Sequence, residues 1–155
     1  MKKSIEIHNN HQKIRDIEGL VEDVSIRFLL QETYYGNIMA LSDFVFLNLC
    51  KLEGEYPIRI EFESDHDAYK FIWTLDKVLY DNLLSIRLDP DIQFDNLIEK
   101  LSDKVFYNDS EQSVQFYFAT RSFNHSLSMN RMNQLRAYYK TTSTIIQKHD
   151  TFFDN

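Results

Sequence analysis

The fold is decided by residues 58–75, whose sequence is IRIEFESDHDAYKFIWTL. Apolar side chains recur at every second position on both sides of a polar group at residues 64–67. A period of two is typical of a strand with one buried face and one face in water. Polar residues between two such runs are typical of a turn. We therefore expect a β-hairpin with strands at residues 58–63 and 69–75.

Upstream of the hairpin, the hydrophobic pattern predicts one short strand and two helices. Residues 4–7 alternate briefly, which predicts an edge strand. Apolar residues then recur at spacings of three and four, which predicts helices at residues 11–30 and 32–52. Asn10 is the expected N-cap of the first helix, and Gly54 is the expected stop of the second.

Downstream of the hairpin, residues 76–91 have no clean period, and we predict a loop there. A short helix is predicted at residues 92–102, followed by strands at 105–107 and 114–118. A long helix is expected at residues 124–149. Its apolar stripe consists of Leu127, Met132, Leu135, Tyr139, Thr142 and Ile146.

This order of elements predicts an α+β fold, because adjacent hairpins are kept apart from the helices. We expect a two-layer α/β sandwich, in which helices cover a mainly antiparallel sheet, plus the extra C-terminal helix. Residues 1–122 form the sandwich in this interpretation, and residues 123–155 are a C-terminal helical extension of the same domain. A chain of 155 residues has the usual length of one domain.

The composition excludes several classes of function. The chain has 17 basic and 24 acidic residues and a net charge of −7, which argues against nucleic acid as the main partner. No apolar stretch approaches the roughly 20 residues of a membrane-spanning helix. The single cysteine, Cys50, fits a reducing compartment. We therefore expect a cytoplasmic protein that binds neither nucleic acid nor membrane.

The stretch ETYYGNIM at residues 32–39, together with the order of elements, resembles a known superfamily. It is similar to the ATP-binding proteins of the histidine-kinase, gyrase and Hsp90 type, in particular the bacterial anti-sigma-factor serine kinases. The resemblance covers residues 3–120. It implies an ATPase-like sandwich whose second helix carries a water-orienting acidic residue and a Mg²⁺-binding asparagine. It also implies an adenine-reading aspartate and glycine-rich turns at the nucleotide.

The family's functional residues are mostly replaced in this chain. By the family's spacing, Phe44 stands in place of the acidic residue, and a phenyl ring cannot accept a proton. The Mg²⁺-binding asparagine is present as Asn48. The adenine-reading aspartate falls on Leu75, with Asp76 one place late, and a slip of one residue reverses the facing of a strand. We expect Phe44 to be buried against residues 75–84.

The glycines of the family's nucleotide site are also missing. The three glycines are Gly19, Gly36 and Gly54. Phosphate loops need glycine because successive backbone N–H groups must face the anion without a Cβ in the way. We therefore expect a degenerate nucleotide site with no catalytic residue and no bound cofactor. The remnant positions of that site are Asn48, Asp76 and Phe44.

Each remaining candidate site has a simpler explanation. Asn48 is either a Mg²⁺ ligand or a helix residue that hydrogen-bonds locally, and the second is favoured because Mg²⁺ would have too few oxygen ligands. His8 and His11 lack the spacing of a zinc site. Cys50 lies near the end of an apolar helix, where a thiol packs as a small hydrophobic group. We expect no metal site.

These patterns favour a non-enzymatic regulatory module that acts by binding a protein. The resemblance implies a sigma factor or an anti-sigma antagonist as the partner, and the C-terminal helix favours a homodimer. One alternative is a divergent anti-sigma serine kinase that binds ATP and Mg²⁺, with Asp43 or Asp76 in place of the lost acids. The other alternative is an unrelated α+β domain.

Overall fold

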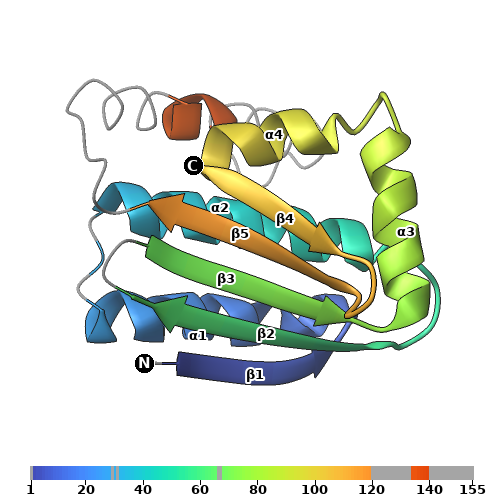
Figure 1. Cartoon of the computed structure of the whole chain (residues 1–155), viewed down its shortest axis with the longest axis horizontal. Coiled ribbons are helices and arrows are strands. Elements are labelled where there is room, and N and C mark those ends of the chain that lie inside the picture. Colours follow the sequence, from blue (N-terminus) through green and yellow to red (C-terminus); the bar gives the residue numbers. More distant parts are fainter. Residues whose placement is uncertain (1, 29, 31, 66–67, 120–133, 140–155) are drawn as a thin grey trace, which may run out of the picture.

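The described residues form a five-stranded sheet at the centre of the structure (Figure 1). The structure is a computed structural model, and it describes residues 2–28, 30, 32–65, 68–119 and 134–139. The strands are β1 (Lys2–His8), β2 (Pro57–Ser64), β3 (Ala68–Leu75), β4 (Lys104–Asn108) and β5 (Ser113–Ala119). They lie in the order β1-β2-β3-β5-β4, and every neighbouring pair is antiparallel. The expected hairpin is confirmed as β2 and β3, with Ile60 opposite Trp73.

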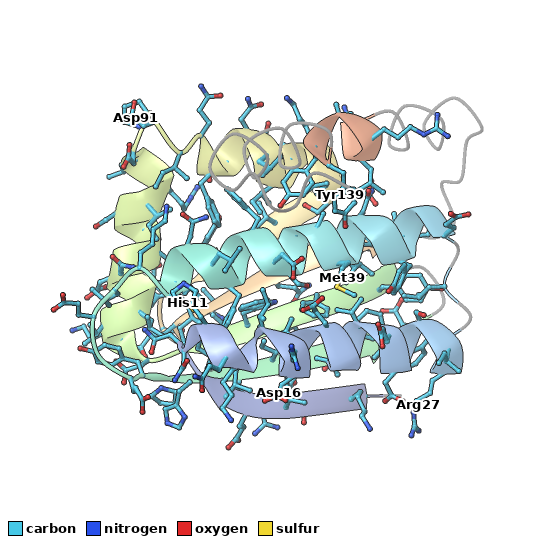
Figure 2. The ribbon with its side chains drawn as sticks, turned by 180° about the vertical axis from the view of Figure 1, so that it is seen from behind. His11, Asp16, Arg27, Met39, Asp91 and Tyr139 are labelled. Atoms are coloured by element: carbon cyan, nitrogen blue, oxygen red, sulfur yellow. The ribbon has the colours of Figure 1, made fainter. Side chains whose placement is uncertain are left out.

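Helices α1 (Ile14–Arg27) and α2 (Glu32–Leu49) cover one face of this sheet. The other helices of the described residues are η1 (His11–Lys13), α3 (Lys77–Leu88), which lies beside the ends of the strands, and α4 (Phe94–Leu101), which packs against β4 and α2. Helices α1 and α2 lie side by side on the same face, as Figures 1 and 2 show from opposite sides. Within the part of the chain that the structure describes, no helix combines the length and apolar character that crossing a membrane requires.

The predicted α+β two-layer sandwich is confirmed, but the predicted loop at residues 76–91 is wrong. Helix α3 occupies most of that segment. Its buried positions include Leu79, Leu83 and Ile86, which have helical spacing. Leu88 is 85% exposed. Apolar residues such as Leu88 on the exposed side of the helix hide the helical spacing of its buried residues in the sequence. The ATPase fold itself stays a prediction.

The predicted C-terminal helix falls mostly outside the described residues. Residues 134–139 are helical, and they include Leu135 and Tyr139 of the expected stripe. The stripe residues outside the described part are Leu127, Met132, Thr142 and Ile146. The extension at residues 123–155 is therefore described only in this segment, and the homodimer stays a prediction.

The core between the sheet and the two covering helices is a ladder of aromatic rings. Phe62 of β2 stands opposite Phe71 of β3, with ring centroids 5.8 Å apart. Phe71 stands in turn opposite Phe116 of β5. Phe28, just after α1, packs on Phe62 with centroids 5.2 Å apart. A shift of one residue would turn these rings to the open face of the sheet, so their burial fixes the strand register.

Asn9 joins the end of α2 to the start of β2. Its side-chain nitrogen donates to the carbonyl oxygens of Leu49 and Leu52, both at 3.3 Å. Its side-chain oxygen accepts from the N–H of Tyr56 at 2.6 Å. Asn9 is 5% exposed, so water does not compete for these hydrogen bonds. This cap fits the end of α2 at Leu49, three residues before the predicted end at residue 52.

Replacing Asn9 by alanine should lower the free energy of unfolding by about 2–4 kcal/mol, because several buried backbone groups lose their partners. The measurement is urea unfolding followed by the fluorescence of Trp73, the only tryptophan of the chain.

The matched control is Asn10→Ala. Asn10 caps the short helix η1, where its side-chain oxygen accepts one exposed hydrogen bond from the N–H of Gln12 at 3.0 Å. Loss of such a cap should cost about 1 kcal/mol or less. Equal losses in the two variants would contradict the special role of Asn9.

Candidate functional site

Phe44 and Asn48 lie one helical turn apart on α2, so they share one side of that helix. Phe44 is half-buried, and its ring stacks on Phe94 of α4 with centroids 5.3 Å apart and an interplanar angle of 27°. Phe44 is therefore half-buried rather than fully buried, and the ring stacked on it is Phe94; its expected contact with residues 75–84 stays a prediction. Phe94 is fully buried, and the ring pair joins α4 to α2.

A cavity of about 590 Å³ opens beside Phe44. It lies between α2, α4 and the helical segment 134–139. Its apolar lining consists of Phe44, Ile92, Leu97, Leu101, Ala137 and Tyr138. Small-molecule and side-chain pockets of roughly 300–1,000 Å³ usually have such a lining, with a few polar groups placed among it.

The polar part of the cavity lining comes mainly from α4 and the turn before it. The polar lining residues are Asp91, Gln93, Asn96, Lys100 and Gln134. The side-chain nitrogen of Asn96 donates to Oε1 of Gln93 at 3.2 Å. Gln93 has a φ of 52°, in the left-handed region that side chains with a Cβ rarely adopt. Backbone conformations of this kind cluster at functional sites, and here the strained residue lines the cavity.

The polar groups of the cavity are those that can form hydrogen bonds and one charged contact of each sign. Its described lining offers one ammonium group, one carboxylate, three amides and one phenol, and it includes no histidine, cysteine or serine. These groups can hold an apolar side chain and form hydrogen bonds around it.

Arg87 of α3 fixes the position of α4 and with it one wall of the cavity. Its guanidinium donates to both carboxylate oxygens of Asp95, at 2.9 and 3.2 Å. The same guanidinium lies 3.8 Å from the ring centroid of Tyr107 on β4. The hydrogen bond to Asp95 raises the pKa of Arg87, and burial raises the pKa of Tyr107 to about 12. A two-point ion pair on an aromatic face is a rigid contact.

Asn48 uses its side chain locally. Its nitrogen donates to the carbonyl oxygen of Phe44 at 2.8 Å, and its oxygen accepts from Nζ of Lys51 at 3.2 Å. Asn48 is 4% exposed and is not part of the cavity lining. Of the two explanations that the sequence left open, the structure supports local hydrogen bonding.

Asp76 is the N-cap of α3. Its carboxylate accepts from the N–H of Val78 at 2.9 Å, and the helix begins directly after it. This carboxylate also places a negative charge at the positive end of the helix, which stabilises the helix. The structure does not bring Asp76 together with Phe44 in the cavity.

Asp43 has a setting that the sequence does not indicate. Burial first, and the charge of Glu18 on α1 second, raise the pKa of Asp43 to about 6. Its Oδ1 atom is buried and has no hydrogen-bond partner among the described residues. Asp43 is next to Phe44 in the sequence, but one helical step of about 100° turns it away from the cavity. No single stretch of sequence could reveal this setting, because two helices create it.

The other candidate residues have no ligand-binding arrangement in the described structure. Burial raises the pKa of Cys50 to about 11, so the thiol stays protonated at neutral pH, as expected of a packed cysteine. Across the described residues, no group of three or more histidine, cysteine, aspartate or glutamate side chains is placed to hold a metal ion.

Comparison with known proteins adds no assignment to this geometry. No family model matches the sequence, and no curated protein matches it. The cavity is therefore interpreted from its own residues.

The contact between Phe44 and Phe94 can be tested by a double-mutant cycle. Phe44→Ala should lower the free energy of unfolding by about 2 kcal/mol, less than the 3–5 kcal/mol of a fully buried phenylalanine, because the ring is partly in water. Phe94→Ala should cost about 3–5 kcal/mol. The two losses should fall short of additivity by about 0.5–1.5 kcal/mol, the energy of a stacked pair, in urea unfolding. Strict additivity would contradict the contact.

Proposed function

We propose that this chain is a non-enzymatic regulatory module that binds a protein partner through the cavity beside Phe44. The observation that supports this most directly is the apolar lining of the cavity, with a phenyl ring where the resembled family has an acidic residue. An aromatic or aliphatic side chain of a partner would fill the cavity as an anchor. Polar groups such as Lys100 and Asn96 would form the rim around that anchor.

The geometry of α3 supports the proposal that nucleotide binding has been lost. The helix begins directly after β3, and Leu79 and Leu83 are fully buried in the core. The carboxylate of Asp76 lies at the N-terminus of this helix, where a phosphate would need uncapped N–H groups and positive potential. Phosphate would therefore meet a negative charge at this end of the helix.

The resemblance to anti-sigma proteins implies a sigma factor or an anti-sigma antagonist as the partner, and these two are the first to test. In this proposal the module regulates its partner by binding it, and no phosphoryl group is transferred.

Millimolar ATP or ADP with Mg²⁺ should leave the Tm of the chain unchanged. A ligand at 100 times its Kd stabilises a protein by about 2.7 kcal/mol, which shifts the Tm of a chain of this size by several degrees. The measurement is a thermal-shift assay in which Mg²⁺ and ionic strength are matched between samples. A saturable, nucleotide-dependent rise in Tm would favour the serine-kinase alternative and contradict the proposal.

A partner that copurifies with the full chain should bind Asn96→Arg at least about tenfold more weakly than wild type, a loss of 1.4 kcal/mol or more. Asn96 is exposed and lines the cavity, so a long charged side chain there blocks the anchor without disturbing the fold. The measurement is isothermal titration calorimetry with the purified partner.

Glu99→Arg is the matched control for this experiment. Glu99 is also exposed on α4 but does not line the cavity. This variant introduces the same side chain on the same helix and should keep most of the affinity. An equal loss in the two variants, or none in either, would contradict binding through the cavity.

A further inference from the structure

Asp43 lies where α2 meets both α1 and the helical segment 134–139. One of its carboxylate oxygens, Oδ1, is buried and lacks a hydrogen-bond partner among the described residues. Buried carboxylates in folded proteins are normally paired or hydrogen-bonded. An ionised oxygen without partners loses its hydration, and no protein contact offsets that free-energy cost. An exception of this kind indicates a position that tolerates, or uses, the neutral form.

The groups that act on Asp43 come from each element packed against it. Glu18 faces it from α1, and among the described residues its charge adds to burial in raising the pKa of Asp43. Tyr35 lies on the same helix, α2, and Tyr139 belongs to the helical segment; the charge of Asp43 contributes to raising the pKa of both phenols. Burial is the largest cause of the raised pKa of each phenol. Glu22 also raises the pKa of Tyr35, and Tyr138 also raises that of Tyr139. The described surroundings of Asp43 are therefore acidic or neutral.

The helical segment 134–139 packs directly on α2. A Cβ at Gly36 would collide with the side chain of Leu135, so the segment approaches the backbone of α2 at this glycine. Tyr139 lies between the segment and α2 in Figure 2. The same segment supplies Gln134, Ala137 and Tyr138 to the cavity wall. Docking of the segment thus both covers the surroundings of Asp43 and completes the cavity.

We propose that Asp43 is a proton-operated latch, whose protonation fastens the helical segment 134–139 onto α2 and closes one wall of the cavity. Ionisation of Asp43 weakens this docking and opens the wall. The consequence for partner binding rests on the proposed function of the cavity, whereas the docking itself does not.

The direction of the pH effect follows from the burial of Asp43. Its pKa is about 6 in the structure, with the segment docked. In this proposal, release of the segment exposes the carboxyl to water and so lowers its pKa toward the ordinary value of 3.8. The docked state therefore binds the proton more tightly than the released state. The stabilisation is fully present below the ordinary value and is lost as the pH rises through about 6.

The test is hydrogen–deuterium exchange of the full chain, followed in the peptide that contains residues 134–139. After correction for intrinsic exchange, protection in wild type should fall by about tenfold between pH 5 and pH 7. Asp43→Asn, which cannot ionise, should keep its pH 5 protection at pH 7. The samples are kept at low concentration, because the sequence pI is about 5.2.

Two further variants control for other causes. Asp16→Asn removes a carboxylate of α1 that lies on the side of β1 rather than α2 (Figure 2), and it should keep the pH dependence of wild type. Gly36→Ala should lower the protection of the segment at both pH values but keep the pH dependence, because Leu135 must shift away from the added methyl group while Asp43 is unchanged.

Constant protection in wild type, or an unchanged fall in Asp43→Asn, would overturn the latch. The exchange measurement needs no partner, so it separates the latch from the proposed function. If the latch result is obtained while the partner binds Asn96→Arg normally, the latch stands and binding through the cavity is refuted. The opposite pair of results refutes the latch alone.

Discussion

Burial of helix α2 on nearly every side is the constraint on which the rest of the structure depends. Ile38, Leu41 and Val45 are fully buried. The sheet and α1 cover most of the helix, α4 reaches it through the Phe44–Phe94 pair, and the segment 134–139 reaches it at Gly36. A helix that is apolar all round is stable only as the centre of a core. Each neighbouring element is thus needed to cover one of its sides.

Polar groups on such a helix must be satisfied by the helix itself or by its ends. Ser42 donates to the carbonyl oxygen of Ile38 at 2.6 Å, Asn48 bonds within its own turn, and Asn9 caps the last carbonyls. Asn37 is an exception, since it is fully buried and both of its side-chain polar atoms lack a partner among the described residues. Asp43 is the second exception on this helix, and its carboxyl can become neutral by taking up a proton.

The parts of the fold that the sequence predicted are those whose pattern is local. The hairpin of β2 and β3 follows from a period of two, and α1 and α2 follow from apolar residues at helical spacing. The sequence did not predict helix α3, because apolar residues lie on its exposed side, as Val78 and Leu88 do, as well as on its buried side, which leaves no clean period. The ring partner of Phe44 and the setting of Asp43 could not be predicted, because residues distant in the sequence create both.

The cavity combines a rigid floor with walls of a different kind. Its floor is Phe44 on α2, a helix with many fully buried residues, such as Ile38, Leu41 and Val45. Its walls are the eight-residue helix α4 and the segment 134–139. Parts of a protein that open locally are drawn from regions with little buried apolar area, whereas core helices open only with the whole fold.

Arg87 ties α4 to α3 through a two-point ion pair, so this wall is held firmly. The segment 134–139 rests on α2 through Leu135 and neighbours a carboxylate that is costly to ionise there, so it is the wall whose position responds to conditions. If a partner's side chain enters this cavity, as we propose, one adjustable wall would let conditions regulate that binding, whereas catalytic groups need every side of their site held in place.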